Sequence, residues 1–311
     1  MLRCRRLSTL GLFGERRCLA TTITTQDSSP QTMEGSARAI PITLQPDRPS
    51  GSHSADHESD QQQHAAAGES PRLGFTPPEE EEVEAPPLYD THIRTNPFQK
   101  TILTFGAAAA ALLDPRRHDM VAVLGETTGG SALARLHTAM VEDPEGCRIL
   151  VDKPRINSST IDLDTLAKLP KDTLGRMYIS FLEDNKVTPD SRLPVQFVDN
   201  PELAYVMQRY REGHDLFHTT LGMPTNMLGE VAVKWVEAIQ TGLPMCYGAA
   251  VFGPLRFRPK QRQKYVSVYL PWAIRVGRTA RLLMNIYFEE RWDQSIHQLR
   301  EEFGVEAPPS I

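Results

Sequence analysis

Hydrophobic and polar positions after about residue 88 repeat with the period of a helix rather than that of a strand. Apolar side chains recur every three or four residues, in successive segments that end at proline or glycine. The pattern predicts helices over 98–114, 117–125, 130–141, 162–169, 172–185, 200–221, 225–241, 272–290 and 293–303. Residues 147–151 have the composition of a short strand. We therefore predict a mainly α fold, a single multi-helix domain over residues 88–311 with at most a short strand pair.

The chain before residue 88 lacks this periodicity. Residues 1–20 carry five arginines and two hydroxyl side chains, Ser8 and Thr9, with Glu15 as their one acid. That composition is typical of a mitochondrial transit peptide rather than a secretory signal. Residues 21–87 are rich in Ser, Gln, Pro and acidic side chains, so they cannot bury enough apolar surface to offset the entropy of ordering. We predict a transit peptide at 1–20 and a disordered acidic linker at 21–87.

Charge narrows the classes of partner. The formal net charge of −5 arises before residue 88, and a neutral domain argues against nucleic acid as a partner. The longest apolar run, 102–113, is shorter than a bilayer span requires. A basic run surrounds Pro259 and is either a solvated loop or a contact with anionic lipid headgroups, which would make the protein a peripheral membrane protein. The basic run consists of Arg256, Arg258, Lys260, Arg262 and Lys264.

The candidate chemistry lies on the helix predicted over 200–221. His214 and His218 fall on its apolar stripe at the i, i+4 spacing that lets two imidazoles bind a single ion. Asp215 lies at the border of that stripe. The helix must end near 222–224, and Glu230 follows in the first turns of the next helix. The sequence predicts a metal site formed by His214, Asp215, His218 and Glu230.

Other interpretations of these residues stay open. A buried histidine is often hydrogen-bonded to the backbone, and Glu230 can form an exposed i, i+4 pair with Lys234. Glu237 is a second candidate carboxylate. Zinc is the favoured ion, although two histidines with one carboxylate also suit Fe²⁺. A four-ligand tetrahedral site would be closed, so catalysis needs either a ligand that leaves or a larger coordination shell with room for substrate or water; we assign the catalytic role to the carboxylates Asp215 and Glu230.

Several segments also resemble a known family. They include 205–212, the pattern His214-Asp215-x-x-His218 with Glu230, and 125–128, 234–237, 241–244 and 271–273. Over residues 88–303 the chain resembles the Coq4 family of mitochondrial ubiquinone biosynthesis proteins. The resemblance implies a peripheral protein at the matrix face of the mitochondrial inner membrane.

The activity that the resemblance implies is oxidative decarboxylation at ring carbon one of a polyprenylated hydroxybenzoate, with hydroxyl replacing carboxylate. The partners that it implies are the polyprenylated ubiquinone precursor and the other enzymes of the pathway in a multi-subunit complex; self-association is left open. The competing interpretation is a non-catalytic, lipid-binding scaffold with a structural metal. A metal-dependent phosphohydrolase is a weaker alternative, because the chain has no matching upstream histidine and downstream aspartate. Methionines and a phenylalanine near the site form either a groove for the prenyl tail or plain core, namely Met207, Met223, Met227, Met245 and Phe217.

Overall fold

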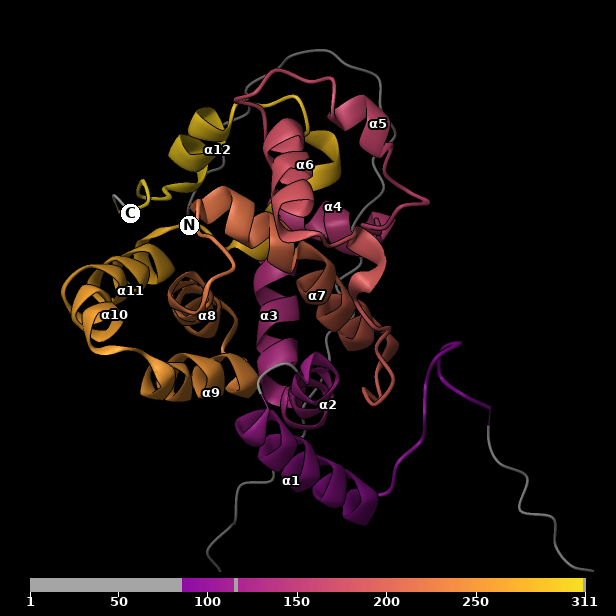
Figure 1. The fold of residues 1–311 in the computed structure, drawn as a ribbon. Helices are drawn as coiled ribbons and strands as arrows, with labels where there is room; N and C mark the ends of the chain where they lie inside the picture. The colour runs from indigo at the N-terminus through magenta and orange to yellow at the C-terminus, as the bar shows by residue number, and fades with distance from the viewer. Residues whose placement is uncertain (1–85, 115–116, 310–311) are drawn as a thin grey trace, which may run out of the picture. The chain divides into compact units, whose positions relative to one another are not determined.

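The computed structural model describes residues 86–114 and 117–309, and these residues are mainly helical (Figure 1). The described part of the chain contains no strand, only an isolated antiparallel bridge between Thr173 and Ser295. The predicted mainly α, single-domain fold is confirmed. The predicted transit peptide at 1–20 and nearly all of the predicted linker at 21–87 lie outside the described residues.

The helices follow one another with short connections. Their bounds are α1 Pro97–Leu113, α2 His118–Thr128, α3 Gly130–Glu142, α4 Pro144–Asp152, α5 Leu163–Leu166, α6 Leu174–Asn185, η1 Pro189–Ser191, α7 Pro201–Leu221, α8 Met227–Thr241, α9 Pro244–Phe252, η2 Gly253–Arg256, α10 Pro259–Lys264, η3 Tyr265–Tyr269, α11 Leu270–Thr279, η4 Leu283–Asn285, η5 Phe288–Glu290 and α12 Ile296–Phe303. Among the described helices, none is long and apolar enough to cross a bilayer.

Helix α7 lies at the centre of the domain, where α3, α6 and α8 pack against it (Figure 1). Its start is set locally: the Asn200 side chain accepts hydrogen bonds from the N–H groups of Glu202 and Leu203, and Pro201 occupies the first turn. From residue 206 to its end the helix is buried on every side. The prediction of a single apolar stripe was therefore too narrow, because α7 also buries its charged face.

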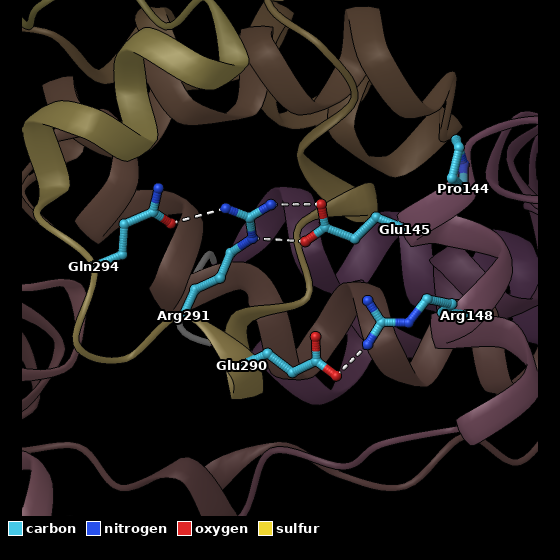
Figure 2. A pocket seen from close by; sticks show the side chains of 6 residues that line it. All are labelled: Pro144, Glu145, Arg148, Glu290, Arg291 and Gln294. Atoms are coloured by element: carbon cyan, nitrogen blue, oxygen red, sulfur yellow. Dashed lines mark hydrogen bonds and ion pairs between the residues drawn. The ribbon is translucent and has the colours of Figure 1, made fainter. Parts of the chain in front are cut away.

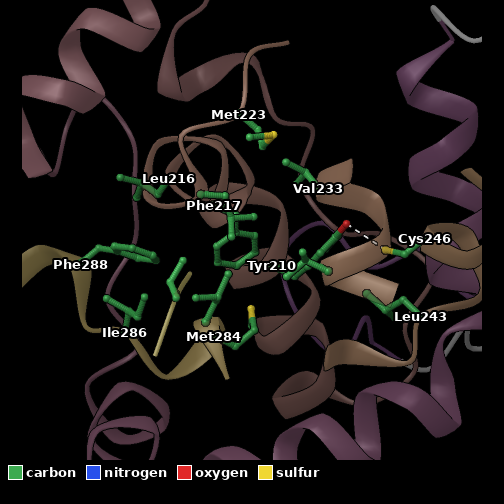
Figure 3. Packing of buried hydrophobic residues seen from close by; sticks show 14 of the residues in the cluster. Tyr210, Leu216, Phe217, Met223, Val233, Leu243, Cys246, Met284, Ile286 and Phe288 are labelled. Carbon is green, nitrogen blue, oxygen red and sulfur yellow. Dashed lines mark hydrogen bonds between the residues drawn. The ribbon is translucent and has the colours of Figure 1, made fainter. Parts of the chain in front are cut away.

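Apolar side chains of α7 pack against segments that are distant in sequence. Figure 3 shows Phe217 facing Met284 and Phe288, which come from the region of η4 and η5. Phe217 and Phe288 have their ring centroids 6.2 Å apart. This packing holds α7 against the η4–η5 region near the end of the chain.

Two local predictions were wrong. Residues 147–151 lie in α4, not in a strand, because Asp143 caps a helix that has Pro144 in its first turn. The helix predicted over 272–290 ends at Thr279. Ala280 is extended, the Arg281 N–H donates to the Phe303 carbonyl, and two 3₁₀ turns, η4 and η5, follow. The apolar residues of 283–288 enter the core as turns rather than as the face of a helix.

Candidate metal centre

A reversal between α7 and α8 brings the two halves of the site together. Gly222 ends α7 in the left-handed region at φ 67°, and the N–H groups of Gly222 and Met223 return to carbonyls of the last turn. The Asn226 side chain then caps α8. Because the chain folds back over five residues, Glu230 in the first turns of α8 faces the last turns of α7.

His218 has one ring nitrogen satisfied and the other free. Its Nδ1 lies 3.0 Å from the Met223 carbonyl oxygen, which can only accept, so Nδ1 carries the proton. The Nε2 atom is buried and has no hydrogen-bond partner. A buried nitrogen without a partner is costly, and an ion at this position would supply one.

His214 is held in a similar way by a side chain. Its Nδ1 lies 2.6 Å from Oε1 of Glu237, a buried residue of α8. The two imidazole rings stand at 90° to each other with centroids 4.8 Å apart. Both rings therefore use Nδ1 for anchoring and direct Nε2 toward Glu230.

The distances fit a metal ion. The Oε2 atom of Glu230 lies 3.4 Å from Nε2 of His218 and 3.8 Å from Nε2 of His214, and the three ligand atoms all lie within 4.8 Å of one another. Two atoms that are each about 2.1 Å from a tetrahedral ion lie about 3.4 Å apart. His214, His218 and Glu230 thus form a group that can hold a metal ion.

The electrostatics favour ionised Glu230. Burial raises its pKa, but when the imidazoles of His214 and His218 are protonated in the metal-free centre, their charge outweighs burial and holds the pKa well below its usual range. About a third of the Glu230 side chain is exposed, whereas that of His218 is fully buried. Water therefore contacts the Glu230 side chain rather than the His218 ring.

Asp215 lies outside this group in the described structure. Its carboxylate accepts a hydrogen bond from Arg192, in the loop between η1 and α7, and only 7% of its side chain is exposed. Asp215 is not part of the group whose ligand atoms lie within 4.8 Å of one another. Ligation by Asp215 stays a prediction.

Lys234 does not form the exposed pair with Glu230 that the sequence allowed. Its Nζ lies 2.6 Å from Oε2 of Glu237 rather than pairing with Glu230. Glu237 was a candidate ligand in the sequence, yet its carboxylate lies behind His214 and contacts Nδ1 instead of the centre. No sequence pattern identifies Arg192 as the partner of Asp215, or the Met223 carbonyl as the partner of His218.

Most of the apolar residues that the sequence predicts near the centre belong to the core. Met207, Met223, Met245 and Phe217 are buried core residues, and only Met227 of the predicted set is exposed. A separate pocket beside α4 has a volume of about 430 Å³. Figure 2 shows the side chains that line it, namely Pro144, Glu145, Arg148, Glu290, Arg291 and Gln294. Its charged side chains pair with one another, so it offers no unpaired ligand group.

A solved structure shares this fold. The crystal structure of a protein with an inferred ubiquinone biosynthesis role from Nostoc punctiforme matches with a TM-score of 0.54 and 21% identity, over 69% of this chain and 100% of that one. At that identity the match concerns the fold alone.

Sequence relatives are much closer. The chain is 59% identical over 215 residues to the mitochondrial ubiquinone biosynthesis protein COQ4 homolog of Aedes aegypti, covering 69% of this chain and 78% of that protein. It is 60% identical over 224 residues to the homolog of the same name from Xenopus tropicalis, covering 72% and 80%. Residues 89–309 match the family model for coenzyme Q (ubiquinone) biosynthesis protein Coq4. The chain belongs to the Coq4 family.

Proposed function

We propose that this protein acts in ubiquinone biosynthesis as a metal-dependent enzyme that removes the carboxylate at ring carbon one of a polyprenylated hydroxybenzoate and leaves a hydroxyl group there. The observation that carries the proposal is the buried, unpartnered Nε2 of His218, which faces Glu230 and His214. Membership of the Coq4 family supports the pathway, and the relatives are named mitochondrial.

The proposed reaction releases CO₂ and adds an oxygen, so it needs a two-electron oxidant from outside the chain. A bound zinc or ferrous ion supplies a Lewis acid that binds oxygen anions of the substrate. The residues of the chain have distinct tasks. His214 and His218 would hold the ion, and the partly exposed Glu230 could accept a proton or give up its place as a ligand.

We propose that Asp215 is the exchangeable fourth ligand. With Asp215 on Arg192, His214, His218 and Glu230 would hold the ion with three protein ligands, and a position would stay open as catalytic sites require. A fourth ligand from Asp215 would close the site. Arg192 is 28% exposed and can turn toward solvent when the carboxylate leaves.

The test is zinc and iron content of the purified protein together with turnover of a prenylated hydroxybenzoate, followed by mass spectrometry. Glu230→Gln should fold, bind metal more weakly than the wild type and turn over the substrate more than tenfold more slowly. Glu212→Gln is a matched control, because it removes a buried carboxylate of α7 that pairs with Arg155 away from the centre. A metal-loaded wild-type protein that leaves the substrate unchanged under oxidising conditions would contradict the enzyme assignment.

A scaffold role is the second candidate, because α1 leaves a row of apolar side chains uncovered. Phe98, Ile102 and Phe105 are each more than half exposed and lie on one face of the helix. That face suits docking of the other pathway enzymes. The two roles differ in cells: loss of catalysis accumulates the carboxylated precursor, whereas loss of docking lowers every later intermediate.

We also propose that the protein binds the matrix face of the inner membrane through α10 and its neighbours. The five residues of the basic run are exposed. Beside them Leu255 and Val266 are 72% and 58% exposed, which gives a surface both cationic and apolar. Replacing three residues of the basic run by glutamate, namely Arg258, Lys260 and Arg262, should abolish flotation with anionic vesicles. The control changes Lys168→Gln and Lys171→Gln should not. Binding that survives the triple change, or that ignores salt, would refute this surface.

A further inference from the structure

Glu237 has a place in the site that metal ligation does not explain. Its side chain is 2% exposed, and its two oxygens serve different partners. Oε1 lies 2.6 Å from Nδ1 of His214. Oε2 accepts from Lys234 Nζ at 2.6 Å and from the Tyr210 hydroxyl at 2.7 Å. The carboxylate is thus fixed on one edge and presents the other to the histidine.

This geometry selects the tautomer of His214. Lys234 Nζ lies 3.4 Å from the same Nδ1, and an ammonium can only donate. Donation from Lys234 would leave the proton on Nε2 and remove that atom as a metal ligand. The shorter contact with Glu237 favours the proton on Nδ1, so the Nε2 lone pair faces Glu230.

We propose that Glu237 is a positioning residue that makes His214 a metal ligand, and that Lys234 and Tyr210 hold its carboxylate in place. A carboxylate behind a metal-bound histidine orients the ring and strengthens its basicity. The inference rests on the metal centre of the proposed function, but not on its reaction. His218 needs no such residue, because its Nδ1 is anchored by the Met223 carbonyl.

The competing explanation is that Glu237 only neutralises a buried lysine. The two explanations diverge when both charges are removed. A buried ion pair replaced by apolar side chains of similar size is often neutral for stability. Lys234→Met combined with Glu237→Leu should therefore be more stable than Glu237→Leu alone, in which Lys234 loses its partner, whereas it cannot restore the contact with His214.

The experiment measures Zn²⁺ affinity by chelator competition, the visible spectrum of the Co²⁺-loaded protein and thermal unfolding of the metal-free protein. Glu237→Gln places an amide beside Lys234; the amide turns its oxygen to the lysine and its NH₂ to His214, which selects the wrong tautomer. We expect Zn²⁺ affinity to fall about 10–100-fold and the Co²⁺ spectrum to change. The double variant should unfold at a higher temperature than Glu237→Leu alone and keep the loss of affinity.

Glu126→Gln is the matched control, since Glu126 is also buried and paired with an arginine, Arg211, but does not contact the centre. It should lower stability and leave Zn²⁺ affinity unchanged. Wild-type affinity in Glu237→Gln, or its return in the double variant, overturns the inference. A wild-type protein that binds neither Zn²⁺ nor Co²⁺ overturns the metal centre itself, which is a separate result.

Discussion

The ion pair between Asp215 and Arg192 provides a quantitative test of the exchangeable ligand. Asp215 is almost fully buried, and Arg192 is partly exposed. Arg192→Met keeps most of the side-chain length and removes the cation. A buried charge that loses its partner costs about 3–5 kcal/mol. Because water reaches Arg192, we expect a smaller loss, about 2–3 kcal/mol, in the metal-free protein.

Zinc should remove most of that loss, because the released Asp215 carboxylate gains the ion as its new partner. Stability that is recovered on binding must appear as tighter binding, since the two are linked. A recovery of about 2 kcal/mol corresponds to about 30-fold tighter Zn²⁺ binding by Arg192→Met than by the wild type.

The assay is thermal unfolding in chelator and in excess zinc. In chelator, the unfolding temperature of Arg192→Met should fall by about 4–12 °C for a domain of this size. Arg155→Met is the control, because Arg155 pairs with the buried Glu212 on the same helix. Its loss should be equal in both conditions. Equal destabilisation of Arg192→Met with and without zinc would refute the exchange and leave Asp215 outside the coordination shell.

Two further predictions concern the frame around the centre. In Gly229→Ala the new Cβ would lie 2.0 Å from the Pro224 carbonyl oxygen, so α8 must shift and move Glu230. We expect the variant to have reduced stability and reduced Zn²⁺ affinity. In the control Gly130→Ala nothing lies within 4 Å of the new Cβ, so both properties should be unchanged. Burial raises the pKa of the Cys246 thiol to about 12. At pH 8 the native protein should therefore be alkylated at Cys246 about 1,000-fold more slowly than an ordinary thiol, and the rate should rise roughly tenfold per pH unit. Peptide mass spectrometry measures this rate, and fast labelling of the folded protein would contradict the burial of Cys246.

Local signals explain why the bounds of the two site helices were predictable. Asn200 and Pro201 start α7, Gly222 ends it and Asn226 starts α8, each through bonds within a few residues. His214 and His218 share a face because they are four residues apart on one helix. Their approach to Glu230 followed from a short reversal between two helices, which the sequence also marks.

The contacts that complete the centre have no local signal. Arg192 meets Asp215 across 23 residues, and Glu237 meets His214 across 23 residues on another helix. These pairs depend on how α8 and the loop before α7 pack, so periodicity cannot identify them. The end of α11 was missed for the same reason, because a backbone hydrogen bond from Arg281 to the distant Phe303 carbonyl holds the chain beyond it.

The buried charges of α7 connect the fold to the precision of the centre. They pair with partners from four other parts of the chain: Arg209 with Glu289, Arg211 with Glu126, Glu212 with Arg155 and Asp215 with Arg192. A rotation of α7 about its axis would break these pairs together and leave several buried charges unpaired, each at a cost of several kcal/mol. The helix therefore has one favoured rotation. Since ligand atoms must stay within about 0.5 Å of the productive geometry, this rotational restraint is what lets His214 and His218 keep Nε2 directed at Glu230 before any ion binds.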